Sequence, residues 1–209
     1  MAKKCTTDKD LYEDVEFCQG SASLPGVRPH IYMTRRANIV VFPKPQGDDA
    51  TKLEDVAVIT DNFVLVENAK FVKIDLVDGE SEPTSESQGA EGSKSFLNKL
   101  SVVLPGTKKK VTGLIAKMNN DDVVFLYPQR DGALRLIGNE LFRVQVELGQ
   151  NGGKQVTDPN QTTINISVSD EYPSPFYEGT IETDDGVISG QTDTVVSDGN
   201  DDNDGNDNG

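Results

Sequence analysis

Residues 141–148 read Leu-Phe-Arg-Val-Gln-Val-Glu-Leu, and apolar and polar side chains alternate along this segment from residue 142 onward. Successive side chains of a β-strand point to opposite faces, so such a strand has one apolar face and one face that meets water. The alternation recurs in residues 71–77 and 162–168. These three segments predict half-buried strands of antiparallel sheets.

Shorter runs rich in β-branched and aromatic residues lie between turn-forming residues elsewhere in the chain. They cover residues 38–42, 56–60, 63–67, 96–104, 123–127 and 133–137. One segment has a different period, because Val111, Leu114, Ile115 and Met118 share one face of a helix. We therefore expect a mainly β protein, an antiparallel β-sandwich or barrel with one packed α-helix at about 107–119, for which Thr107 is the candidate N-cap.

Composition divides the chain into three parts. Residues 1–35 are irregular and proline-stiffened, which predicts an extended N-terminal arm, and residues 36–182 form the β domain. A long polar loop is expected at 78–95, where no large apolar side chain occurs. Such a loop in a compact domain is either functional or disordered, and both interpretations stay open. Residues 183–209 lack a core pattern and predict a disordered acidic tail.

The net charge of −15 is concentrated at the end of the chain. From residue 181 to 209 there are nine acids and no base, whereas the other 180 residues contain 26 acids and 20 bases. A protein that grips nucleic acid neutralises phosphates with a basic face, and this balance does not favour one. The run of lysines at 108–110 is the one basic cluster, and it is typical of a solvated helix start or loop.

Sequence signals for export and redox chemistry are weak. Cys5 and Cys18 lack CxxC spacing, and His30, the single histidine, cannot complete a zinc site with them. We expect two free thiols, with one local bridge as the alternative. No apolar segment follows the first lysines, and no window is apolar enough for a membrane span, so we expect a protein that stays in the cytoplasm where it is made.

Motifs of catalysis and ligand binding are missing from the sequence. His30 follows Pro29 and has no partner set for nucleophilic catalysis, and no phosphate-binding glycine loop follows a strand. Residues 200–205 carry oxygen ligands like the start of an EF-hand loop, but no closing acid and no flanking helix. We expect no enzyme activity, no cofactor, no metal and no catalytic residue.

An ordered series of segments resembles the structural proteins of tailed phages and prophages, above all tail tube proteins. The series comprises residues 96–103 (Phe-Leu-Asn-Lys-Leu-Ser-Val-Val), the helix, 119–126 (Asn-Asn-Asp-Asp-Val-Val-Phe-Leu), 131–138 (Asp-Gly-Ala-Leu-Arg-Leu-Ile-Gly) and 170–179 (Asp-Glu-Tyr-Pro-Ser-Pro-Phe-Tyr-Glu-Gly). The likeness covers roughly residues 75–180 and includes no catalytic motif.

The resemblance implies a virion protein, made in the cytoplasm of a host bacterium, that binds copies of itself and other virion proteins. Its rings, typically of six subunits, would stack into a tube around a DNA channel. The loop at 78–95 would be ordered by the next ring. An acidic lumen would let DNA pass without specific binding. The tail would lie outside the tube, so removal of residues 184–209 is expected to leave assembly intact.

Two other functions remain open from the sequence. The first is a monomeric β-sandwich binding module, adhesin-like or carbohydrate-binding, whose candidate site residues are Tyr172, Phe176 and Tyr177. The chain has no tryptophan, the residue that such sites commonly use. The second is an acidic protein that mimics DNA to block a nuclease, an interpretation that the mild charge of residues 1–180 disfavours.

Overall fold

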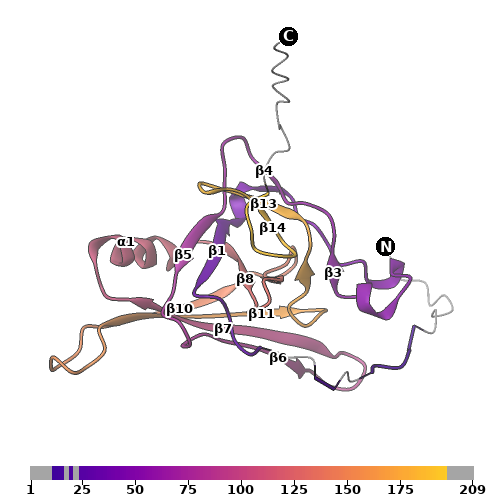
Figure 1. Cartoon of the computed structure of the whole chain (residues 1–209), viewed down its shortest axis with the longest axis horizontal. Coiled ribbons are helices and arrows are strands. Elements are labelled where there is room, and N and C mark those ends of the chain that lie inside the picture. Colours follow the sequence, from indigo (N-terminus) through magenta and orange to yellow (C-terminus); the bar gives the residue numbers. More distant parts are fainter. Residues whose placement is uncertain (1–10, 17–18, 21–23, 197–209) are drawn as a thin grey trace, which may run out of the picture.

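The computed structural model describes residues 11–16, 19–20 and 24–196, and it confirms the mainly β fold with one α-helix in this part of the chain. Two larger sheets lie on opposite sides of the main core, with the helix at one end (Figure 1). Two shorter two-stranded sheets cover the outer side of one of them. This arrangement is consistent with the expected β-sandwich.

The larger sheet has six strands in the order β3-β12-β9-β8-β1-β5. Their bounds are β1 His30–Arg35, β3 Val58–Ile59, β5 Val72–Asp75, β8 Val123–Pro128, β9 Leu134–Ile137 and β12 Phe176–Tyr177. All neighbours pair antiparallel except β12 and β3, which run parallel. Every residue of β8 is buried, because this strand is covered on both faces.

The second sheet has four antiparallel strands in the order β10-β11-β7-β6. Their bounds are β6 Glu82–Gln88, β7 Ser95–Pro105, β10 Gln145–Asn151 and β11 Gln161–Asp170. Along β11 the even-numbered side chains are buried and the odd-numbered ones are more exposed. This alternation is the one that the sequence predicts for residues 162–168, and it leaves the sheet with one apolar and one polar face.

The main core lies between these two sheets. Both sheets contribute buried side chains to it. Ile31, Phe125 and Ile137 come from the six-stranded sheet, and Val102 and Ile164 come from the four-stranded sheet. The helix α1 spans Lys109–Met118, buries Met118 in this core and packs Val111 and Leu114 against it. The predicted helix is therefore confirmed. Its N-cap is Lys108 and no side chain caps it, so the prediction for Thr107 is wrong.

A second apolar core lies on the opposite face of the six-stranded sheet. Its central side chains include Tyr32, Leu126, Leu134 and Tyr177. The hairpin of β13 (Thr180–Thr183) and β14 (Gly186–Ser189) contributes Ile181 and Ile188 to this core. A two-stranded ribbon of β2 (Ile39–Val41) and β4 (Val64–Leu65) packs Ile39 and Leu65 against it. Short 3-10 turns at Arg36–Asn38, Gly47–Asp49 and Leu53–Asp55 lie in the connections from β1 to β2 and from β2 to β3.

Two boundaries predicted from composition are wrong. The arm predicted for residues 1–35 ends earlier, because β1 at His30–Arg35 is an inner strand that pairs with both β5 and β8. The polar loop predicted at 78–95 contains β6, which pairs with β7 from Glu82 to Gln88. Backbone hydrogen bonding to an apolar neighbour compensates for the missing apolar side chains of β6, which a composition rule does not detect.

The start of the predicted disordered tail is also misplaced. Residues 183–196 include β14 and a turn that is hydrogen-bonded to it, with Val196 N donating to Val187 O and Ser189 N donating to Thr194 O. Ile188 is 4% exposed in the second core. Ile181 and Ile188 are therefore enough to order this polar segment, because the hairpin of β13 and β14 places them on an apolar face that already exists. Residues 197–209 lie outside the described residues.

Candidate functional site

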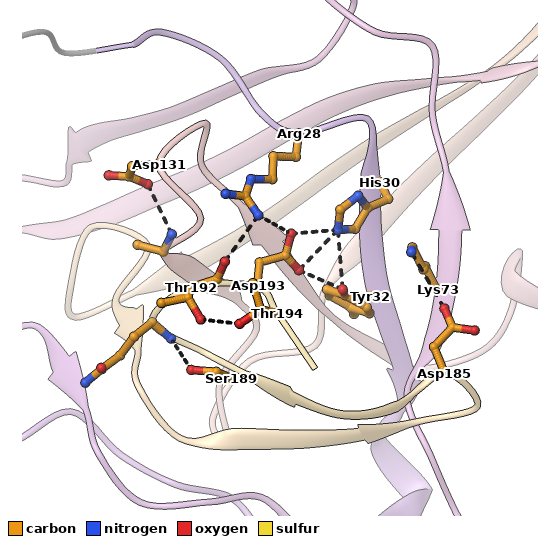
Figure 2. A network of polar contacts seen from close by, with 12 residues as sticks. Arg28, His30, Tyr32, Lys73, Asp131, Asp185, Ser189, Thr192, Asp193 and Thr194 are labelled. Atoms are coloured by element: carbon orange, nitrogen blue, oxygen red, sulfur yellow. Dashed lines mark hydrogen bonds and ion pairs between the residues drawn. The ribbon is translucent and has the colours of Figure 1, made fainter. Parts of the chain in front are cut away.

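A buried carboxylate near the end of the described chain collects polar groups from its beginning (Figure 2). The Asp193 side chain is 1% exposed and the residue has a φ of 56°, in the left-handed region. Tyr32 donates its hydroxyl proton to Oδ1 at 2.7 Å, and Arg28 donates from Nη1 to Oδ2 at 3.0 Å. His30 Nε2 lies 3.0 Å from Oδ2.

Electrostatics in this network favour the ionised carboxylate. Burial alone raises the pKa of Asp193, but the hydrogen bonds from His30, Tyr32 and Arg28 outweigh burial and hold the pKa below its ordinary value. Burial, followed by the contact with Asp193, raises the pKa of Tyr32 far above its ordinary value. Tyr32 therefore acts as a neutral hydrogen-bond donor. The groups of the network are bonded to one another, so the network joins the segment before and within β1 to the turn after β14.

A cleft opens between residues 42–45 and residues 138–142 beside the six-stranded sheet. Its volume is about 280 Å³, and its apolar lining includes Phe42, Ile59 and Leu136. Leu141 and Phe142 on its rim are 72% and 51% exposed. The ion pair between Lys44 Nζ and Glu140 Oε2, at 2.6 Å, joins the two walls.

One acid in this cleft is buried. Asp170 is 8% exposed and accepts hydrogen bonds from Asn139 Nδ2 at 3.0 Å and from Tyr172 N at 3.3 Å. Burial raises its pKa despite these bonds. The site therefore combines apolar walls with a carboxyl group that is protonated more readily than usual, features of a small-ligand pocket.

The outer face of the four-stranded sheet is polar and shallowly hollowed. A cavity of about 400 Å³ there is lined by Glu82, Thr84, Lys99, Leu100, Ser101, Glu147, Asn165, Ile166 and Ser167. The Lys99 ammonium group, the base in this lining, is held by Glu86 Oε2 at 2.8 Å. Hydroxyl and amide groups fill the space between the acids, and Ser101 donates to Asn165 Oδ1 at 2.8 Å.

Apolar side chains are exposed on the ribbon of β2 and β4. Val40, Val41, Val64 and Val66 are between 42% and 62% exposed. The opposite side of the ribbon is bound to the second core through Ile39 and Leu65. Exposed valines that are neighbours in a short two-stranded ribbon form an apolar patch, and such patches commonly mark interaction surfaces.

The aromatic residues predicted as a carbohydrate site are not brought together in one exposed site. Tyr177 is completely buried, accepts a hydrogen bond from Phe63 N and donates its own hydroxyl proton to Thr180 O. Phe176 lies against the guanidinium group of Arg135, at 4.3 Å from the ring centroid. Only Tyr172 lines the cleft. The prediction of a joint aromatic site is therefore wrong.

Other sequence-based site residues divide into two groups. The lysines at 108–110 lie exposed at the start of α1, as predicted, and His30 has the structural role described above. Cys5, Cys18 and the calcium-like residues 200–205 lie outside the described residues. Within the ranges that the structure describes, no group of metal-ligating side chains gathers, and no helix has the length and apolar character to cross a membrane.

The Asp193 network was missed at the level of sequence. The signal for its donor side was present, because Arg28, His30 and Tyr32 are spaced by two residues and share one side of an extended chain. The acceptor could not be found, since Asp193 is one of nine acids in a segment that composition alone marks as irregular.

The chain was compared with protein-family models, curated proteins and solved structures. No protein-family model, no curated protein and no solved structure matches this chain.

Proposed function

We propose that this chain is a structural subunit that assembles with copies of itself, as a tail tube subunit of a tailed phage does. The mainly β fold with one helix agrees with what the resemblance in residues 96–179 implies. In this proposal the rings stack around a DNA channel, and the subunit acts through its surfaces and not through catalysis.

The exposed ribbon of β2 and β4 is the observation that carries the proposal. Burying four exposed valines in a contact between copies removes apolar surface from water, at about 25 cal/mol per Å². The ribbon is braced from behind by the second core, so little ordering of its backbone is needed on association. A rigid, apolar and uncovered surface of this kind suits a permanent contact better than a transient one.

The outer face of the four-stranded sheet supports the channel part of the proposal. Glu82 and Glu147 stand among hydroxyl and amide groups, and Lys99 is neutralised by Glu86. A wall of this composition has a net negative charge, which repels phosphate groups. A lumen lined by this face would let DNA pass without adhering.

A ligand-binding module is the second candidate, and the cleft between residues 42–45 and 138–142 favours it. The carbohydrate site expected from the sequence does not support this candidate, because Tyr177 is buried and Phe176 packs under Arg135. In this alternative a small apolar ligand with a hydrogen-bond donor would bind beside Asp170. The protein would then be monomeric, and its ligand binding would follow a one-site isotherm.

Substitution on the ribbon separates these functions. The double variant Val40→Thr, Val64→Thr keeps β-branched side chains in both strands and lowers their hydrophobicity. We expect sedimentation velocity to show fewer assembled species than for the wild-type chain, with an unchanged thermal unfolding midpoint. The matched control is Val156→Thr, in an exposed loop. Equal assembly of the ribbon variant and the wild type would remove the ribbon as the basis of the proposal.

A further inference from the structure

One wall of the cleft, residues 138–142, is fixed by the side chain of Asn139. Its Nδ2 donates to Asp170 Oδ2 at 3.0 Å, and its Oδ1 accepts from Leu141 N at 3.0 Å and from Phe142 N at 2.8 Å. These three bonds tie the rim of the cleft to the buried acid in its lining. A ligand would therefore meet a wall that is already in place, as in most small-molecule sites.

Aromatic rings and aliphatic side chains make up the apolar part of the lining. The rings are those of Phe42, Phe142 and Tyr172, and Leu136 and Leu141 add aliphatic surface. The cleft volume of about 280 Å³ lies just below the usual range for ligand pockets, about 300–1,000 Å³. This lining and this volume suit a small ligand with one ring or a short aliphatic body.

The charged part of the lining has more acids than bases. It contains three acids, Glu140, Asp170 and Glu171, and one base, Lys44. The Lys44 ammonium group is paired with Glu140 at 2.6 Å, which leaves Asp170 and Glu171 without a base among the lining residues. Arg36 also contacts this wall, but its guanidinium group donates to the backbone carbonyl oxygens of residues 139 and 140. The lining therefore favours a ligand that brings a positive charge.

Asp170 is the acid in the lining that such a ligand would satisfy. It is 8% exposed, and burial raises its pKa because the carboxylate loses water that no positive charge replaces. Its hydrogen bonds come from Asn139 and from the backbone of residues 171 and 172, whereas a carboxylate has about four acceptor sites. A positively charged donor in the cleft would use the remaining acceptor capacity and compensate for burial of the carboxylate.

We propose that the cleft binds a small organic cation, an amine whose ammonium group donates to Asp170 and whose apolar body packs between the aromatic walls. The same rings add cation–π attraction to the ammonium group. A carboxylate ligand is disfavoured, since it brings a second negative charge next to Asp170 and Glu171. Among the described residues, the exposed valines of the ribbon do not line the cleft, so the inference goes beyond self-assembly and applies equally to an assembled subunit and to a monomer.

Three probes with similar apolar bodies and different charges test the ligand class. Equilibrium dialysis of the full-length chain against phenethylamine, phenethyl alcohol and phenylacetate gives the dissociation constants, and it measures binding to monomers and to assembled chains alike. Phenethylamine should bind at a single site with a dissociation constant about tenfold below that of the alcohol, the effect of a charge-assisted hydrogen bond in place of a neutral one. Phenylacetate should bind most weakly of the three.

Substitutions locate the bound amine in the cleft. Asp170→Asn should weaken binding of phenethylamine to the level of the alcohol and leave the alcohol unchanged, and it should remain folded because burial already opposes ionisation of Asp170. Phe142→Ala removes an aromatic wall that is 51% exposed, so it should weaken both ligands by a similar factor. Glu80→Gln is the matched control, because it removes the same charge from an exposed residue outside the lining, and it should change neither affinity.

Equal affinities of the wild type for the amine and the alcohol would overturn the inference. Amine binding that a folded Asp170→Asn chain retains would also overturn it, because the attraction would then come from the acidic chain as a whole. If circular dichroism shows that Asp170→Asn is unfolded, the three probes on the wild type and the Phe142→Ala chain decide the question. Sedimentation of the same samples separates the two proposals. An assembled chain without amine binding overturns this inference alone, whereas amine binding by a chain that stays monomeric supports it and overturns assembly.

Discussion

The Tyr32 hydroxyl donates a 2.7 Å hydrogen bond to Asp193 Oδ1 and thereby joins residues that are 161 positions apart. The same carboxylate accepts a hydrogen bond from Arg28 and contacts His30. The strand β1 is an inner strand of the larger sheet, so this network ties the turn after β14 to the centre of the fold. The last described residues are consequently part of the domain.

Replacement of Asp193 by Asn should destabilise the protein by about 2 kcal/mol, because partly buried donors lose their ionised partner. Asn has the same shape and tolerates the left-handed backbone that Asp193 adopts, so the variant isolates the charge. Urea denaturation gives the free energy of unfolding. Asp185→Asn is the matched control, since its ion pair with Lys73 is exposed and its loss should change stability little. An equal effect of the two changes would show that the Asp193 network is not stabilising.

The stability of the wild-type chain should depend on pH through Asp193. Its pKa is lower in the folded than in the unfolded state, so its contribution is present above the ordinary aspartate value of about 3.9 and is lost as the pH falls through the folded value. Asp170 acts in the opposite sense, because burial raises its pKa and its ionisation disfavours the fold. Urea denaturation across the acid range should show a smaller loss of stability on acidification for Asp193→Asn than for wild type. Parallel curves would exclude this role.

Two glycine substitutions should have opposite effects. A Cβ at Gly190 would overlap the carbonyl oxygens of Tyr177 and Gly179, both of them backbone atoms, so Gly190→Ala should cost about 2 kcal/mol or more. Gly113 lies on the exposed side of α1 with open space around it, and Gly113→Ala should stabilise the helix by up to about 1 kcal/mol. Thermal unfolding of the two variants compares the shifts directly. A stabilised Gly190→Ala chain would contradict the packing described for this turn.

Truncation should give different results on either side of residue 196. Removal of residues 184–209 deletes β14 and Asp193, so the expectation from sequence that it leaves assembly intact is replaced by an expected loss of folding. Removal of residues 197–209 should leave folding and assembly unchanged. Circular dichroism and sedimentation of both truncated chains provide the comparison, and a folded chain that ends at residue 183 would show that β14 is dispensable.

Some strands with an apolar face could be predicted from the sequence, because burial of one face imposes a period of two on the residues. The strand predicted within 141–148 begins only at Gln145, and Leu141 and Phe142 lie exposed before it. Residues 162–168 lie within β11 as expected, and Val111, Leu114 and Met118 form the inner face of α1. The four exposed valines of the β2–β4 ribbon had no such signal. In sequence an exposed valine resembles a buried one, and only the three-dimensional packing shows which face is uncovered.

Elements that depend on long-range pairing could not be predicted. The strand β6 has no large apolar side chain and exists because its backbone pairs with β7. The hairpin of β13 and β14 depends on the apolar face of the six-stranded sheet, which Ile181 and Ile188 cover. Both segments are polar, so their composition predicts a loop and a tail. Local composition contains no information about the distant strand or sheet face against which each segment packs.

Electron microscopy of the purified full-length chain at rising concentration, with light scattering alongside, tests the central claim most directly. The account predicts rings or tubes with a central channel that form without any cofactor, and a subunit count that can be read from end views. A chain that scatters as a monomer at every concentration and binds a small apolar ligand in the cleft beside Asp170 would contradict the account and establish the binding module in its place.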